Sequence, residues 1–519
     1  MNKDFLKRLT EAHSWLGLII SGLLFVVFFA GSISLFRDEI NQWSMQPHIK
    51  LSQKAPLPIS QIIESAIQGL PFDPKEHLTL VAPTKHSPYY KAYVDVQHVA
   101  GEKDYVSVLI DPNTGEKVGD PDDFELADFI YDLHTDLNIP AGTYVIGVVT
   151  LLFFFALISG VFIHARKLIN NFFKYRSEEN PRSKLLDMHN VVGVMSLPFT
   201  LMYAFSGLIF NLVIIYQIVF AIVLYKGDQQ ALLDDGGYKV VKTEWVDKAW
   251  DKPTIDALYQ QTSDKYNVAP RLVRIYNYGD ESAVLHFFIS EKSSLTSNFE
   301  VAFNLKDNSI YFKRDFENPN TLRTGLNVIS TLHFGSYAGF DLRILYFILG
   351  MGVCGLIVTG NLLWIEKRSR QRNQSRKTLA FVNNFTLWST GGVIIATAIA
   401  FLVERITPLN ILDRADYMIG SFIATLVIIA ILLLFNRDKK LFLGWLLKIS
   451  GFIAISVILC DWLMFTDEMI TLANQGVTTI IGTQIGLAIM ATLFIFSGSK
   501  LTKSHVVDHV IKSDGVVLE

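Results

Sequence analysis

The chain has little cysteine and little charge for its length. Only two of its 519 residues are cysteines, and both Cys354 and Cys460 lie inside apolar runs. This excludes a disulfide framework, a cysteine-ligated iron–sulfur cluster and a covalently attached c-type haem. Charged residues make up 18% of the sequence, against about 25% in an ordinary soluble domain. The 46 basic and 49 acidic residues nearly cancel, which gives no support for nucleic-acid binding.

Two nucleotide-binding motifs are also missing. No G-x-x-x-x-G-K-[ST] sequence occurs, so the chain is not a P-loop ATPase. No G-x-G-x-x-G opens a strand–turn–helix unit, which argues against a nicotinamide or flavin domain within the chain. Apolar sequence dominates instead, because half of the residues are hydrophobic and the mean hydropathy is +0.32. The composition therefore excludes a soluble enzyme and indicates a lipid environment.

Long apolar runs predict a multi-pass membrane protein. A transmembrane helix needs roughly 20 apolar residues. Eight segments satisfy this requirement, at approximately 15–36, 143–165, 190–224, 341–365, 381–403, 417–436, 442–465 and 478–498. The first follows three basic residues but lacks a small-x-small cleavage site, so we interpret it as a membrane anchor and not as a signal peptide.

Lysine and arginine gather on one side of these segments. The short loops on the other side hold only Arg405 and Arg414. By the positive-inside rule, both termini are cytoplasmic and two long loops, about 37–133 and 225–332, face outward.

The first two-thirds of the chain is one unit used twice. His13 and His189 lie at the start of the first and third segments, and each is followed by glycine four and eighteen residues later. His134 and His333, each preceded by leucine, lie at the start of the second and fourth segments. Two such units in parallel orientation imply a pseudo-two-fold axis along the membrane normal.

Each long loop predicts a small α+β domain. The first loop has a helix-like stretch from Ile59 to Ile67, and the second has one from Thr254 to Lys265. Strand-like runs that end in a hairpin follow both. The fold class is therefore a mainly α-helical membrane protein with about eight spans, two outer α+β domains and a pseudo-two-fold duplicated core of helices one to four. The expected divisions are a span at 1–36, an outer domain at 37–133, spans at 134–168 and 187–224, an outer domain at 225–332, a span at 333–366, a C-terminal four-helix module at 381–500 and a tail at 501–519.

Four histidines are the candidate ligands. The pseudo-two-fold axis would bring His13 to face His189 at the inner side, and His134 to face His333 at the outer side. Ionisable groups at membrane depth are rare and usually functional. Two facing imidazoles without carboxylate or thiolate partners suit a bis-histidine haem b, so the two pairs predict two haems. A zinc or copper site is the alternative, although a histidine pair offers too few ligands for a closed tetrahedral site.

Four other side chains are further candidates at these sites. His164, level with the inner pair, is a third candidate ligand, a propionate partner or simply an interfacial residue. Arg166 and Lys167 are candidate partners of the inner propionates, and Arg343 is a candidate partner of an outer one. Ordinary interfacial anchoring is the alternative for all three cations.

Several short motifs together resemble the PepSY-associated transmembrane helix family. They are Leu-His before the second and fourth spans, Ser159-Gly160 and Thr359-Gly360, Asp187-Met-His189-Asn190, and the Asp111-Pro-Asn-Thr-Gly-Glu hairpin. The resemblance covers roughly residues 1–370. It implies a bacterial inner-membrane protein linked to iron uptake, with PepSY domains in the two loops. Some members of the family are haem-containing ferric-siderophore reductases.

The resulting hypothesis is a transmembrane electron carrier. A cytoplasmic reductase or a membrane quinol would reduce the inner haem, and the outer haem would reduce a ferric siderophore or another ferric chelate and release Fe(II). One difficulty is the distance from His134 to His164, about 45 Å along an unbroken helix, unless Pro140 and Gly142 break it. A membrane-bound regulator or inhibitor of a periplasmic protease, with no cofactor, is the alternative. A transporter is a third possibility, but it would favour carboxylates in the centres of the helices, and helices one to four have none there.

Overall fold

A computed structural model of the chain describes most of its residues as two compact units. The described residues are 3–45, 47–48, 52, 54–84, 87–97, 103–165, 180–238, 240–251, 254–290, 298–315, 319–371, 375–474 and 477–513. The helical unit takes its residues from 1–44, 126–213 and 340–519. The sheet unit takes its residues from 45–125 and 214–339.

Seven helices in the described part of the chain are long and apolar enough to cross a membrane. They are α1 (Lys3–Ser34), α5 (Gly142–His164), α13 (Gly339–Ser369), the continuous pair α14–α15 (Arg376–Ile406), α16 (Arg414–Phe435), α17 (Lys439–Met464) and α19 (Thr479–Ser513). The chain is therefore a multi-pass membrane protein.

The third expected span, 190–224, is not one continuous helix. It is divided into α7 (Pro181–Met195), α8 (Leu197–Asn211) and the shorter apolar α9 (Val213–Tyr225), and α7 and α8 meet at an angle of 64°. Pro198 lies in the first turn of α8 and has no N–H for the carbonyl four residues earlier, so the helix bends at this point. Among the described residues, seven helices are long and apolar enough to span a membrane, or eight if the bent pair counts as one span.

The second and fourth spans begin close to the apolar segments expected at 143–165 and 341–365, but the histidines expected at their starts lie on separate short helices. His134 lies in the last turn of the short helix α4 (Leu126–Thr135), and His333 lies in the last turn of α12 (Thr321–Phe334). Non-helical residues separate each short helix from the spanning helix that follows. At the first break, a Cβ on Gly142 would lie 1.6 Å from the carbonyl oxygen of Asp136. Only glycine therefore fits where the chain turns from α4 into α5.

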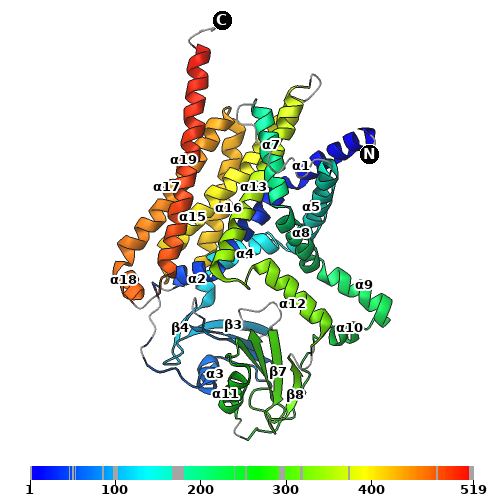
Figure 1. Ribbon diagram of the computed structural model, residues 1–519. Helices are drawn as coiled ribbons and strands as arrows, with labels where there is room; N and C mark the ends of the chain where they lie inside the picture. Colours follow the sequence, from blue (N-terminus) through cyan, green and yellow to red (C-terminus); the bar gives the residue numbers. More distant parts are fainter. Residues whose placement is uncertain are drawn as a thin grey trace. The chain divides into compact units, whose positions relative to one another are not determined.

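The C-terminal module is a bundle of four spanning helices. It consists of α14 (Arg376–Leu387), one π-helical turn (Trp388–Gly392) and α15 (Val393–Ile406), followed by α16, α17, the short α18 (Thr466–Asn474) and α19. Helix α17 packs along α19, and α15 packs against both α16 and α17 (Figure 1).

A buried ion pair links this module to α2 (Arg37–Met45), which follows the first span. Arg405 and Asp461 are each only 1% exposed and form an ion pair. Arg405 donates a hydrogen bond to the carbonyl oxygen of Trp43 at 2.7 Å, and the Trp43 indole donates to Asp461 at 2.8 Å. The ion pair is thus supported by hydrogen bonds, without which burying two charges is unfavourable.

The sheet unit contains one antiparallel sheet of eight strands in the order β4-β3-β2-β1-β5-β6-β7-β8. The strands are β1 (His77–Val81), β2 (Tyr90–Gln97), β3 (Lys103–Ile110), β4 (Lys117–Gly119), β5 (Leu272–Tyr276), β6 (Val284–Ser290), β7 (Asn298–Asn304) and β8 (Ile310–Arg314). Each loop contributes four consecutive strands, and β1 pairs with β5. The two separate domains expected from the sequence therefore share one sheet, because the pairing of β1 with β5 covers an edge that each half would otherwise expose.

One helix precedes the strands of each half. These helices are α3 (Ile59–Ile67) and α11 (Ile255–Tyr266), close to the stretches expected from the sequence. Their apolar side chains, including Ile62 and Leu258, belong to one core with Leu80 and Val273 of the central strands. The unit also contains the short 3₁₀ helix η1 (Pro121–Phe124) and helices α9, α10 (Gln229–Asp235) and α12.

Candidate functional site

His13 of α1 and His189 of α7 lie next to each other in the helical unit. Their ring centres are 6.4 Å apart and their ring planes are nearly perpendicular, at 82°. The sequence repeat predicted that these two side chains would face each other, and the structure brings them together.

The Nδ1 atom of His13 is held by the neighbouring helix α5. It lies 3.0 Å from the carbonyl oxygen of Ala156 and 3.1 Å from Oγ of Ser159. Ser159 in turn donates to the same carbonyl at 2.8 Å. Because a carbonyl oxygen only accepts, Nδ1 carries the proton and donates it, which leaves Nε2 with a free lone pair.

His189 has the same arrangement against α13. Its Nδ1 lies 3.1 Å from the carbonyl oxygen of Leu356 and 3.3 Å from Oγ1 of Thr359. Thr359 donates to the Leu356 carbonyl at 2.9 Å. Both imidazoles are therefore oriented as metal-binding histidines usually are, with Nδ1 on a backbone carbonyl and Nε2 available to a ligand.

A glycine lies four residues after each accepting carbonyl and leaves room for the histidine ring. A Cβ on Gly160 would lie 3.3 Å from Cε1 of His13, and a Cβ on Gly360 would lie 3.2 Å from Cε1 of His189. The Ser-Gly and Thr-Gly steps therefore have a direct role, since the hydroxyl and the carbonyl orient the ring that the glycine accommodates.

His134 follows the same rule on α1. Its Nδ1 lies 2.8 Å from the carbonyl oxygen of Val27, and a Cβ on Gly31, four residues further on, would lie 2.5 Å from that nitrogen. His134 thus lies beside α1 at the level of residues 27–31. From His13 to Val27 the helix rises about 21 Å, at 1.5 Å per residue. The break before α5 therefore removes the difficulty of an unbroken path of about 45 Å from His134 to His164.

A cavity of about 380 Å³ opens beside the inner pair. His13, His189 and His164 all line it, together with Gly17 and Gly193. Its volume falls within the range of about 300–1,000 Å³ that is usual for small-molecule and cofactor sites. His164 is thus placed at the site, and its role as a third ligand stays a prediction.

The donor set would suit a haem held by two histidines. Two imidazoles that each give one nitrogen to the same metal ion, at about 2 Å, would have ring centres at most about 6 Å apart. The separation of 6.4 Å between His13 and His189 is close to this limit. Their hydrogen-bonded Nδ1 atoms and the adjoining cavity supply the orientation and the space that such a group requires.

The other predicted site residues are placed differently. His333 is buried, with 9% of its surface exposed, but it belongs to the sheet unit, so its pairing with His134 stays a prediction. Arg166 and Lys167 lie outside the described residues. Arg343 donates two hydrogen bonds to the carboxylate of Glu39, at 2.9 and 2.6 Å, and this contact gives its side chain a structural role at the start of α2.

Comparison with known proteins decides the family. The model of the PepSY-associated TM region matches residues 10–367, which is more than half of the chain. The chain belongs to the PepSY-associated family. The match confirms the resemblance seen in the sequence, and it ends before the C-terminal module begins.

One curated relative of this PepSY-associated chain is an uncharacterized protein of Pseudomonas aeruginosa. The two are 23% identical over 266 residues, which is 49% of this chain and 66% of the relative. The chain thus matches slightly less than two thirds of that relative's length. Its name attributes no activity to it.

The role of two hydroxyl groups at the site was not predicted from the sequence. Ser159 and Thr359 were noticed because they occupy matching positions in the repeat, but their role depends on a neighbouring helix. The available signal was a hydroxyl residue directly before glycine near the inner end of both spans.

The sheet unit of the PepSY-associated chain holds one group of possible metal ligands among its described residues. Glu76, His77 and Asp95 each place one ligand atom within 4.8 Å of the others. Burial and then the charge of Arg274 lower the pKa of His77, while Asp95 raises it. The same positive charge opposes cation binding, so we assign no site here.

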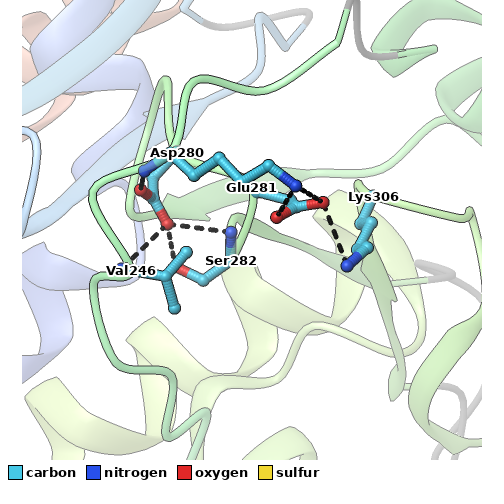
Figure 2. Close-up of polar contacts among 6 residues, drawn as sticks. Val246, Asp280, Glu281, Ser282 and Lys306 are labelled. Carbon is cyan, nitrogen blue, oxygen red and sulfur yellow. Dashed lines mark hydrogen bonds and ion pairs between the residues drawn. The ribbon is translucent and has the colours of Figure 1, made fainter.

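A second polar cluster in the sheet unit is structural. Figure 2 shows the carboxylate of Asp280 accepting hydrogen bonds from Val246 and Ser282. It also accepts one from the backbone N–H of Lys248 at 2.9 Å. Burial raises the pKa of Asp280, but these hydrogen bonds outweigh burial and lower it to about 2. The carboxylate fixes the segment before α11 to the turn that leads into β6.

Proposed function

We propose that this PepSY-associated chain is an inner-membrane haem b protein that carries electrons across the membrane and reduces a periplasmic ferric chelate, such as a ferric siderophore. The observation that carries the proposal is the inner pair. His13 and His189 are 6.4 Å apart, each with Nδ1 on a backbone carbonyl, beside a cavity of about 380 Å³.

The chain's own residues hold and orient the proposed cofactor. His13 and His189 bind one haem through Nε2, and His134 and His333 bind a second. A bound haem supplies reversible one-electron exchange at its iron. Ser159 and the carbonyl beneath it keep the His13 ring in one tautomer and one orientation, so that the ligand does not have to reorganise when an electron passes.

The proposed topology gives the electron its direction. Both termini lie in the cytoplasm, and the sheet unit consists of two PepSY domains in the periplasm, related by the duplication. A membrane quinol or a cytoplasmic reductase donates the electron at the His13–His189 end. One electron converts one Fe(III) of the chelate to Fe(II), which binds hard oxygen ligands more weakly and is released.

The first experiment is a visible absorption spectrum of the purified full chain after haem-replete expression. We expect a b-type spectrum that sharpens on reduction, with about two haems per chain by pyridine haemochrome assay. His13→Ala and His189→Ala should each remove the same haem. His77→Ala, in the sheet unit, is the control and should retain both.

A colourless protein would overturn the proposal. It would favour the alternative that the sequence left open, a PepSY-type regulator or inhibitor of a periplasmic protease without a redox role. Protease inhibition by the same preparation would then be the assay to make.

A further inference from the structure

One end of the cavity beside His13 and His189 is positively charged. Arg182, Lys367 and Arg368 all line it, and Glu11 is the one acidic side chain among its described lining residues. The excess of positive charge indicates a ligand that carries negative charge at this end.

Two of the arginines near this end are already paired. The carboxylate of Glu366 lies 3.4 Å from Arg182 and 2.6 Å from Arg370. Arg368 makes no ion pair with any acidic residue in the part of the chain that the structure describes. Of the two arginines that line the cavity, Arg182 pairs with Glu366, so Arg368 is the one whose charge can pair with a ligand.

Arg368 is nevertheless held in place. Its guanidinium carbon lies 4.6 Å from the ring centre of Trp15 and 4.6 Å from that of Trp364. The two indole rings also contact each other edge to face, with centres 5.6 Å apart. Cation–π contacts with two rings restrict a side chain that would otherwise be mobile, so less entropy is lost when it binds an anion.

We propose that Arg368, held against the rings of Trp15 and Trp364, binds a carboxylate at the rim of the His13–His189 cavity. The inference rests on the proposed function, and in the haem-loaded protein this carboxylate is one of the haem propionates. Arginine suits the task because its planar guanidinium matches a carboxylate in two parallel hydrogen bonds. In the sequence repeat, Lys367-Arg368 corresponds to Arg166-Lys167, so the two repeats would each offer one basic pair to one propionate.

The test compares Arg368→Gln with Arg370→Gln in the full chain. Arg370 lies two residues further along the chain, just after the end of α13, and does not line the cavity. Arg368→Gln should lower the midpoint potential of one haem, because removing a nearby positive charge disfavours the reduced state. It should also speed haem transfer to apomyoglobin about tenfold, the effect of losing a hydrogen bond to a charged group. Arg370→Gln should match the wild type in both measurements, and Arg368→Lys should recover part of the potential.

The tryptophans supply a second arm. Trp15 contacts the arginine but does not line the cavity itself. Trp15→Leu should therefore shift the midpoint potential of the same haem in the same direction as Arg368→Gln. The shift should be smaller, since this substitution loosens the arginine without removing its charge.

Three results would overturn the inference while leaving the proposed function intact. The first is equal potentials and haem-transfer rates in Arg368→Gln and wild type. The second is a shift confined to the haem that His134→Ala removes. The third is an effect that occurs in nanodiscs with anionic lipid and vanishes in neutral lipid, which would assign Arg368 to a lipid phosphate. A protein without haem would overturn both proposals together.

Discussion

At the scale of single residues, three histidines of the chain obey one geometric rule. His13, His134 and His189 each direct Nδ1 to a backbone carbonyl that lies four residues before a glycine of the neighbouring helix. The carbonyl sets the tautomer and the glycine provides the space. The rule gives Gly31, Gly160 and Gly360 one physical reason, because a side chain at any of them would crowd a histidine ring.

Gly17 offers a test of what fills the cavity. A Cβ at this position would meet nothing within 4 Å, and the residue lines the cavity. We expect Gly17→Leu to fold normally but to lose the inner haem, because its side chain would occupy the cofactor's space. Gly355→Leu is the matched control, since this helical glycine also faces open space but lies outside the cavity lining. Haem content and thermal unfolding would be measured together, and equal haem content in the two variants would contradict the expectation.

Asp280 predicts a pH dependence of the sheet unit. Its pKa is lowered to about 2, so its hydrogen bonds stabilise the folded state fully above the ordinary carboxylate pKa and are lost as the pH falls from there toward 2. We expect Asp280→Asn to lower the unfolding temperature at pH 7 and to flatten its fall between pH 5 and pH 3. Glu281→Gln is the comparison variant: this partly exposed carboxylate forms ion pairs with Lys248 and Lys306, which lower its pKa, so it reports the effect of ion pairs without the Asp280 hydrogen bonds. Tryptophan fluorescence during heating gives the measurement, and parallel pH curves for wild type and Asp280→Asn would refute the assignment.

At the scale of elements, the break between α4 and α5 sets the position of the outer histidine. A side chain at Gly142 would collide with the carbonyl of Asp136. We expect Gly142→Ala to displace α4 and to perturb the haem that depends on His134, while the His13–His189 haem keeps its potential. Gly355→Ala should change neither, and redox titration of the two haems distinguishes these outcomes. Loss of both haems in Gly142→Ala would point to general misfolding.

The C-terminal module also packs against α4, the helix that carries His134. Phe129 of α4 packs edge to face on Phe422 of α16, with ring centres 5.1 Å apart, inside a core shared with α15. Removing a buried aromatic ring lowers the free energy of unfolding by about 3–5 kcal/mol. Phe422→Ala should therefore destabilise the protein and shift the midpoint potential of the outer haem. Phe435→Ala lies on the same helix, where its ring is 79% exposed, and should be nearly neutral. Chemical denaturation and the potential of the outer haem are the two readouts, and identical behaviour of the two variants would exclude this role for the module.

At the scale of the whole molecule, the proposed electron path runs through both haems in series. In proteoliposomes with an electron donor on the His13–His189 side and a ferric chelate on the other, wild-type protein should form Fe(II). His13→Ala and His134→Ala should each abolish this transfer, and the double variant should be no slower than either single one, because either break interrupts a single path. Arg370→Gln serves as the active control. Substantial transfer by His134→Ala would show that electrons do not need the outer site.

The multi-pass membrane character and the residues of the inner pair were within reach of sequence reasoning. Spans follow from apolar length, and His13 and His189 follow from the equal spacing of glycines after each of them. The bend at Ser196 was missed because its flanks are as apolar as a span, although Pro198 carried the signal. The cation–π contacts of Arg368 with Trp15 and Trp364 could not be predicted from the sequence either, since the two tryptophans lie on helices separated by most of the chain.

The sequence by itself determined which segments are long and apolar enough to span a membrane and which residues recur at equal spacing, because hydrophobic length and spacing are properties of the chain alone. Only the tertiary structure decided that the two loops form one sheet, that His134 lies beside α1, and that the Arg343 side chain pairs with the carboxylate of Glu39. Each of these depends on contacts between residues far apart in the chain. Such contacts are selected by the packing and hydrogen bonding of the assembled elements, which no local pattern specifies.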